Sequence, residues 1–157
     1  MTVDVVSQSN NAEAEPFMLE VFSNSDETEI DAFSNNPVIL YARLTKGNAP
    51  VIGANVRATI FRPGGPDANP PVVLMMRDNG AGYPDITADD GIYSVYFTDF
   101  ATVPGFYSVQ VSADNNGGSA RTPRLTGFAS NLETEESIHT VLTGMHISLS
   151  LYHICAV

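Results

Sequence analysis

The feature that most constrains the fold of this chain is a strict alternation of apolar and polar residues within short segments. In 38–44, Val38, Leu40 and Leu44 fall on one face of an extended chain, and Tyr41 and Arg43 fall on the other. A period of two places successive side chains on opposite sides of a β-strand. Such a strand buries one face and exposes the other, as in an antiparallel sheet.

The same alternation recurs along the chain, and turn-forming residues separate the segments. The segments are 17–22, 38–44, 55–61, 72–77, 92–97, 106–113 and 146–154. About seven short strands with turn signals every 8–12 residues or so are typical of a β-sandwich. We therefore predict an all-β fold, an antiparallel β-sandwich similar to immunoglobulin or fibronectin type III domains.

Two finer expectations concern single positions. Tyr107, near the start of its strand, is a candidate for the tyrosine corner of such sandwiches. Helix signals occur only in 131–144, where Asn131 is a candidate cap and Gly144 a candidate stop.

Charge limits the classes of partner. The net charge is −11, and the first eight acidic residues precede the first Lys or Arg, which is Arg43. A chain with so few cations is unsuited to nucleic acid or to anionic membrane surfaces, which require Lys and Arg. No apolar run approaches 18 residues, so we expect no membrane insertion. We predict an acidic flexible arm over 1–16 and a single sandwich domain over 17–157, with 114–157 the least defined part.

The stretch DNGAGYPDITADDGIYS (78–94) concentrates four aspartates: Asp78, Asp85, Asp89 and Asp90. Calcium takes six to eight oxygen ligands, often from one flexible loop, so these four are candidate calcium ligands. The stretch is not an EF-hand, because the glycine counted from Asp85 falls one position late and Tyr96 stands where the glutamate is required.

Two other interpretations of the stretch need no metal. Asp and Asn side chains accept hydrogen bonds from backbone N–H groups nearby, and Gly supplies positive φ, so the stretch also suits two hard turns between strands. A catalytic carboxylate pair would need a cleft and perturbed pKa values. The sequence favours the turns, and we identify no catalytic residues and no cofactor other than calcium.

Motifs of other chemistry do not occur in the sequence. It contains no H-E-x-x-H, G-x-S-x-G, Walker loop or G-x-G-x-x-G. Cys155 is the single cysteine, so no intrachain disulfide can form.

Three stretches in order resemble one known family: APVIGANVRATIF (49–61), DNGAGYPDITADDGIYSVYF (78–97) and GFYSVQVSA (105–113). They resemble the β-sandwich segment that follows the von Willebrand A domain in the calcium-activated chloride channel regulators, over about residues 37–113. The resemblance implies a secreted or surface-associated multidomain protein. It carries over no catalytic residues, because this chain has neither the family protease's H-E-x-x-H nor the D-x-S-x-S of its adhesion site.

We therefore predict a non-enzymatic extracellular module that spaces domains or binds a protein partner, with calcium as the candidate rigidifying ion. The extracellular location follows from the resemblance alone, because the first residues lack the basic and apolar regions of a signal peptide. A second hypothesis is self-assembly into a filament, in which HISLSLYHICAV (146–157) pairs with a neighbour's open sheet edge. The third is a hydrolase that uses the loop aspartates.

Overall fold

The structure is a computed structural model that describes residues 3–7, 16–24, 37–126, 129–134 and 147–154. Its regular elements are strands and one short 3₁₀ turn, η1 (Asn116–Gly118). All strand pairs are antiparallel. Within the described part of the chain no helix is long and apolar enough to cross a membrane.

The first sheet, called the β3 sheet, is built around its longest strand. Its strands are β1 (Val3–Ser7), β2 (Phe17–Ser23), β3 (Val38–Lys46), β4 (Ala49–Pro50) and β7 (Ile92–Phe97). Strand β3 pairs with β2 along one edge and with β7 and the short β4 along the other. Strand β1 extends the sheet beyond β2.

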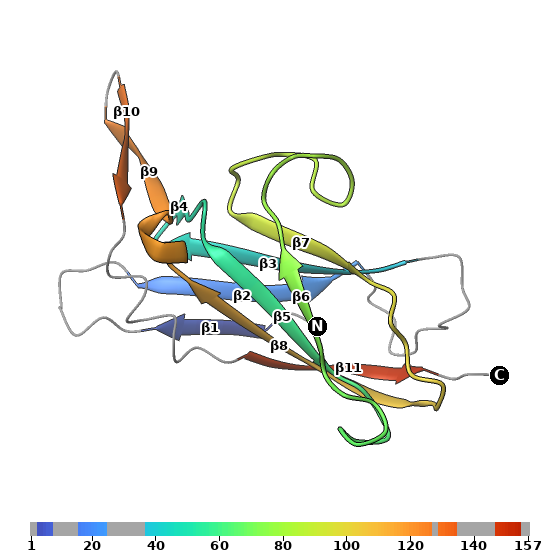
Figure 1. Ribbon diagram of the computed structural model, residues 1–157. Coiled ribbons are helices and arrows are strands. Elements are labelled where there is room, and N and C mark those ends of the chain that lie inside the picture. Colours follow the sequence, from blue (N-terminus) through green and yellow to red (C-terminus); the bar gives the residue numbers. More distant parts are fainter. Residues whose placement is uncertain (1–2, 8–15, 25–36, 127–128, 135–146, 155–157) are drawn as a thin grey trace.

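The second sheet, called the β5 sheet, has four strands in the order β11-β8-β5-β6. Their bounds are β5 (Asn55–Phe61), β6 (Val72–Met76), β8 (Gly105–Asp114) and β11 (Ile147–Ile154). Strands β9 (Arg121–Thr126) and β10 (Ala129–Thr134) form a separate hairpin that projects from one end of the molecule (Figure 1).

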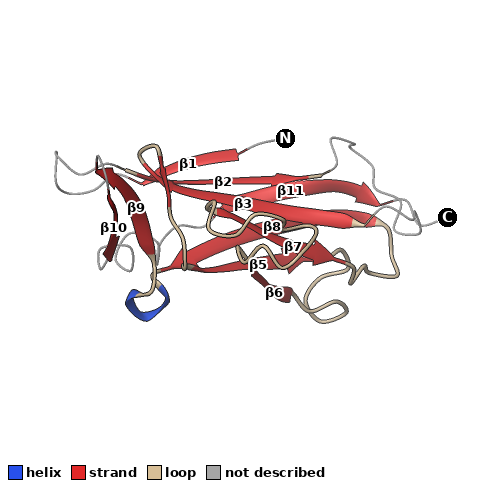
Figure 2. Ribbon diagram, turned by 90° about the horizontal axis from the view of Figure 1, so that it is seen from above, coloured by secondary structure: helices blue, strands red, loops and turns tan. Residues whose placement is uncertain are grey.

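The core lies between the two sheets; in Figure 2, β2 and β3 of the first sheet lie above β5 and β6 of the second. It is made of the alternate, inward-facing residues of the strands, including Leu19, Leu40, Leu44, Val56, Ile60, Tyr93, Phe97, Tyr107 and Val109. Burying one face of each sheet against the other removes apolar surface from water. This burial stabilises the fold by about 25 cal/mol for each Å² of apolar surface. The predicted all-β antiparallel sandwich is therefore confirmed, and its immunoglobulin or fibronectin type III subtype stays a prediction.

The tyrosine-corner contact is present. The Tyr107 hydroxyl accepts a hydrogen bond from the backbone N–H of Ala101, 2.7 Å away. Tyr107 also packs edge-on against Phe97, with ring centroids 5.8 Å apart. The side chain thereby holds the chain between β7 and β8 against the core.

Two expectations differ from the structure. Asn131–Thr134 lies in strand β10 and pairs with β9, so the predicted helix is wrong over those residues. The pairing with β9 decides the conformation, because tertiary contacts override a weak local propensity. Val3–Ser7, which we expected within a flexible arm, pairs with β2 from Val3↔Val21 to Ser7↔Phe17. The remaining residues of the predicted helix, 135–144, and Cys155 lie outside the described residues.

Candidate functional site

The candidate site is the loop 78–91, called the aspartate loop, which connects the two sheets. It leaves β6 in the β5 sheet and enters β7 in the β3 sheet (Figure 1). At its base, the Arg77 N–H donates to the Ser94 carbonyl (3.0 Å) and the Ser94 N–H donates to the Arg77 carbonyl (2.9 Å). This exchange ties the edges of the two sheets together where the loop begins.

Asp78 closes the loop. Its Oδ1 accepts a hydrogen bond from the backbone N–H of Asp90 (3.2 Å), and its Oδ2 accepts one from Gly91 (3.0 Å). One carboxylate therefore joins the first residue of the loop to its last two. Hydrogen bonds that involve an ionised acceptor are about twice as strong as neutral ones.

Asp85 organises the interior of the loop. The side chain is buried, and its Oδ2 accepts hydrogen bonds from the backbone N–H groups of Asn79 and Gly80. The Asp85 carbonyl also accepts a hydrogen bond from the N–H of Gly82 at 3.1 Å. The middle of the loop is thereby folded back onto its first turn.

The other two predicted ligands lie at the end of the loop. Asp90 Oδ1 accepts a hydrogen bond from the N–H of Ile92 at 2.9 Å, which is a local Asx turn. Asp89 is exposed and has a positive φ of 60°. Within the described residues, no three His, Cys, Asp or Glu side chains form a group that could hold a metal ion.

The environment of the Asp78 carboxyl shifts its pKa. The pKa of this carboxyl is raised from 3.8 to about 6, mainly by burial and also by the nearby carboxylates of Asp90 and Asp85. The N–H groups of Gly91 and Asp90 act in the opposite direction, because they stabilise the ionised form. Burial outweighs these hydrogen bonds.

This pKa predicts a pH dependence of stability. The folded carboxyl holds its proton more tightly than the unfolded one, so its ionisation favours unfolding. The free energy of unfolding should fall as the pH rises from about 4 to 6. A two-unit shift corresponds to about 3 kcal/mol, and solvent screening of this half-exposed group reduces the expected fall to about 1 kcal/mol. Urea unfolding at pH 4 and pH 6 measures it.

Asp78→Asn isolates this contribution, because it removes the titrating carboxyl and keeps a side chain of nearly the same size and shape. We expect the difference in unfolding free energy between the two pH values to be smaller in Asp78→Asn than in the unmodified chain. Asp67→Asn, an exposed carboxyl in the 62–71 loop, is the matched control and should leave that difference unchanged. Equal pH slopes in all three proteins would contradict the prediction.

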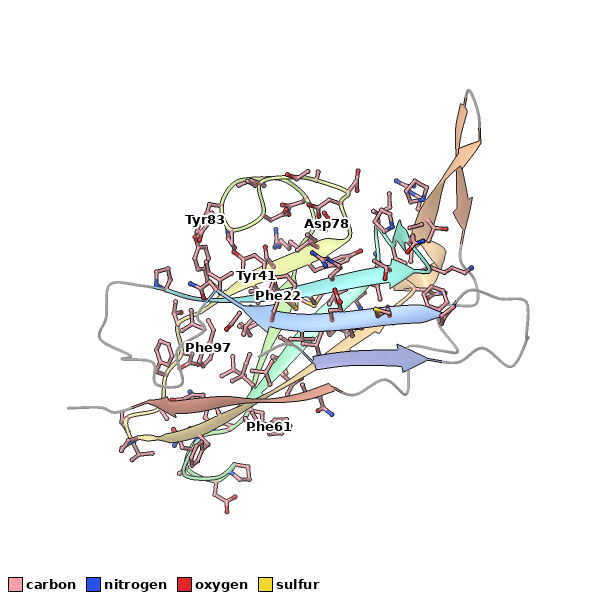
Figure 3. The ribbon with its side chains drawn as sticks, turned by 180° about the vertical axis from the view of Figure 1, so that it is seen from behind. Phe22, Tyr41, Phe61, Asp78, Tyr83 and Phe97 are labelled. Atoms are coloured by element: carbon pink, nitrogen blue, oxygen red, sulfur yellow. The ribbon has the colours of Figure 1, made fainter. Side chains whose placement is uncertain are left out.

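Four aromatic residues, Phe22, Tyr41, Tyr83 and Tyr96, form an aromatic row that holds the loop on the β3 sheet. This row was not predicted from the sequence as part of the site. Figure 3 shows Tyr83, Tyr41 and Phe22 following one another from the loop across the sheet. The Tyr83 and Tyr96 rings lie 6.2 Å apart, and Phe22 stacks on Tyr41 at 5.2 Å. Burial and the Tyr83 hydroxyl raise the pKa of Tyr41.

The sequence signal for the aromatic row was the outward face of two strands, on which Tyr41 and Tyr96 alternate with core residues. These residues fix the position of the loop from outside, while Asp78 and Asp85 fix its shape from within. Fold and site together define a β-sandwich module in which a carboxylate-closed loop joins the edges of the two sheets.

Comparison with known proteins places the chain more closely. It is 41% identical over 111 residues to calcium-activated chloride channel regulator 2 of Mus musculus, a match that covers 71% of this chain and 11% of that protein. It is 37% identical over 121 residues to calcium-activated chloride channel regulator 4 of Homo sapiens, which covers 77% of this chain and 12% of that protein. Most of this chain is therefore a calcium-activated chloride channel regulator-like segment.

The matches cover only a small part of each relative. The chain spans about one eighth of the length of the curated relatives it matches. No family model matches the chain, and no solved structure matches it. The comparison therefore concerns one module of much longer proteins.

Proposed function

We propose that this chain is a non-enzymatic extracellular module of a calcium-activated chloride channel regulator-like protein, which spaces domains or binds a protein partner. Two findings support the proposal. The relatives carry the matched segment as a small part of a much longer chain, and the described residues form a sandwich with its own core. An extracellular setting is consistent with the relatives' description as channel regulators.

The observation that carries the proposal is the use made of the loop carboxylates. Both oxygens of Asp78 and one oxygen of Asp85 accept backbone N–H groups of the same loop. A general base or nucleophile needs its oxygen directed at a substrate, whereas these oxygens hold the connection between two sheets. Their role here is structural, which suits a spacing and interaction module.

A replacement experiment tests the proposal. The matched segment of human calcium-activated chloride channel regulator 4 is replaced with this chain, and secretion of the chimera from cultured cells is measured. We expect secretion near that of the intact protein, and loss of secretion when the inserted chain carries Asp78→Ala, because two loop N–H groups then lose their acceptor. Equal secretion of the chimera, its Asp78→Ala form and a protein lacking the segment would contradict a structural role.

Calcium binding by Asp78, Asp85, Asp89 and Asp90 stays a prediction. Because the loop N–H groups already have carboxylate acceptors, we expect the loop to stay folded in EDTA. Thermal unfolding with millimolar calcium and with EDTA decides the question. Saturation about a hundredfold above Kd would add roughly 2.7 kcal/mol, a shift of several degrees. A shift that Asp78→Ala or Asp90→Ala abolishes would establish a calcium site, and coincident curves would leave the loop a hydrogen-bonded turn.

The two alternative functions stay hypotheses. For filament assembly through 146–157, the structure pairs β11 with β8, from Ile147↔Val111 to Ile154↔Gly105. A neighbouring chain would then have to use the other edge of β11. For a hydrolase, the raised pKa of Asp78 is one requirement, but both of its oxygens are engaged within the loop.

A further inference from the structure

Strand β6 (Val72–Met76) forms one edge of the β5 sheet (Figure 2). It pairs with β5 from Val56↔Met76 to Ile60↔Val72. An edge strand presents backbone N–H and C=O groups to its open side and can receive another strand there. Proteins commonly protect such edges with charged side chains, but 72–76 reads VVLMM.

The direction of the backbone groups of β6 follows from the residue after it. Both the N–H and the C=O of Arg77 point away from β5, to Ser94 of β7. Because alternate residues of a strand direct these groups to the same side, those of Val73 and Met75 also point away from β5. Before Arg77, β6 runs in the β5 sheet, whereas β7 belongs to the β3 sheet. Over the described residues, no backbone partner meets Val73 or Met75 on that side.

The open segment is sharply bounded. Pro71 precedes it and has no N–H to donate, and the groups of Arg77 are already bonded to Ser94. Two residues therefore offer a complete set of donors and acceptors. Their side chains are exposed on the outer face of the sheet, Val73 by 59% and Met75 by 50%.

We propose that β6 is a self-association site, at which a second copy of this chain adds its own β6 in antiparallel register about Leu74. In that register Val73 faces the second copy's Met75, and Met75 faces its Val73. Each facing pair exchanges two N–H···O=C hydrogen bonds, as hydrogen-bonded antiparallel pairs do. The two four-stranded sheets then join into one sheet across a twofold axis. This inference does not depend on the proposed function.

Symmetry and charge favour a second copy as the occupant. The open groups are two donors and two acceptors about one residue, so the strand is complementary to itself, as a twofold interface requires. A net charge of −11 opposes contact between two copies elsewhere, whereas 72–76 carries no charge. The nearest cross-strand neighbour of Met75 is Arg57, which is not acidic.

The area of the site sets the expected strength. The exposed apolar surface consists of Val73, Met75 and the neighbouring Phe61 on the same face. Three side chains are far fewer than the roughly 20–30 residues that each partner contributes to a stable standard interface. We therefore expect a weak, concentration-dependent dimer and not a permanent one.

Sedimentation velocity of the full chain over a wide concentration range tests the proposal. We expect the weight-average mass to rise toward that of a dimer, and Val73→Lys to keep the chain monomeric at every concentration. Val103→Lys is the matched control, because Val103 is 42% exposed but lies in the loop before β8. We expect the Val103→Lys variant still to dimerise. A chain that stays monomeric throughout, or dimers that survive Val73→Lys, would overturn the proposal, as would assemblies larger than a dimer.

A cross-link tests the register directly. In a Cys155→Ser background, Leu74→Cys places two thiols opposite each other on the twofold axis, about 4.5 Å apart at Cα, within disulfide range. Val72→Cys places its two thiols about 13 Å apart, four residues out of register. We expect oxidation to cross-link Leu74→Cys and not Val72→Cys. The reverse pattern, or equal cross-linking of both, would refute the register.

Discussion

Replacing Gly91 with alanine is expected to lower the free energy of unfolding by about 3–4 kcal/mol. Gly91 is buried with a φ of +77°, and an added Cβ would lie 2.7 Å from Cβ of Pro50 and 3.0 Å from the carbonyl oxygen of Leu44. The left-handed backbone costs roughly 1–2 kcal/mol, and overpacking adds roughly 1–3 kcal/mol. Urea unfolding measures the sum.

Gly117→Ala separates the two causes. Gly117 has a similar φ of +64° in η1, but nothing lies within 4 Å of an added Cβ. We expect Gly117→Ala to lower the free energy of unfolding only by the cost of the left-handed backbone, about 1–2 kcal/mol. If the two variants were equally stable, crowding at Gly91 would be excluded as a cause. Such a result would mean that Pro50 and β3 can move away from the loop.

Tyr93→Phe is expected to have the second large effect, about 2–3 kcal/mol. The hydroxyl donates to the Val51 carbonyl (3.0 Å) and accepts from the Ala54 N–H (3.0 Å), and the residue is only 2% exposed. Removing the hydroxyl leaves one buried acceptor and one buried donor without this partner, and each such loss costs about 1–3 kcal/mol. Thermal and urea unfolding both report it.

Tyr96→Phe is the control for Tyr93→Phe, since it removes a hydroxyl from the same strand. Tyr96 is 38% exposed, and its hydroxyl donates to the Tyr83 carbonyl over a long 3.4 Å. Water can replace that partner, so we expect a change within about 0.5 kcal/mol. A loss at Tyr96 as large as at Tyr93 would show that the contact with the aspartate loop, and not burial, sets the energy.

The strands with regular alternation were predictable because the pattern that buries them is local. Predicted segments 55–61 and 92–97 coincide with β5 and β7, and 38–44 lies within β3. The pattern also assigned the faces of 38–44, since Val38, Leu40 and Leu44 are buried while Arg43 is exposed. Strand β9 was missed because it contains Pro123 and two arginines. These residues break the apolar alternation by which the other strands were predicted.

The site was predictable in kind but not in detail. The aspartates and glycines of 78–91 indicated hard turns, and the structure forms them. Which carboxylate bonds which N–H could not be predicted, because Asp78 reaches across the whole loop to Gly91. The role of Tyr41 also depends on contact with a distant segment, the loop residue Tyr83. Such partners are set by the packing of the sheets and not by local propensity.

The pairing of β3 with β7 and of β5 with β8 has a consequence for how the chain folds. Val38 pairs with Phe97, and Asn55 pairs with Asp114. Neither sheet can close until most of the intervening chain is available. Contacts between residues so far apart in sequence slow folding, with times from milliseconds to seconds in sandwiches of this kind. On the ribosome, β3 would therefore wait for β7 to emerge before this pairing could form, and β5 would wait for β8.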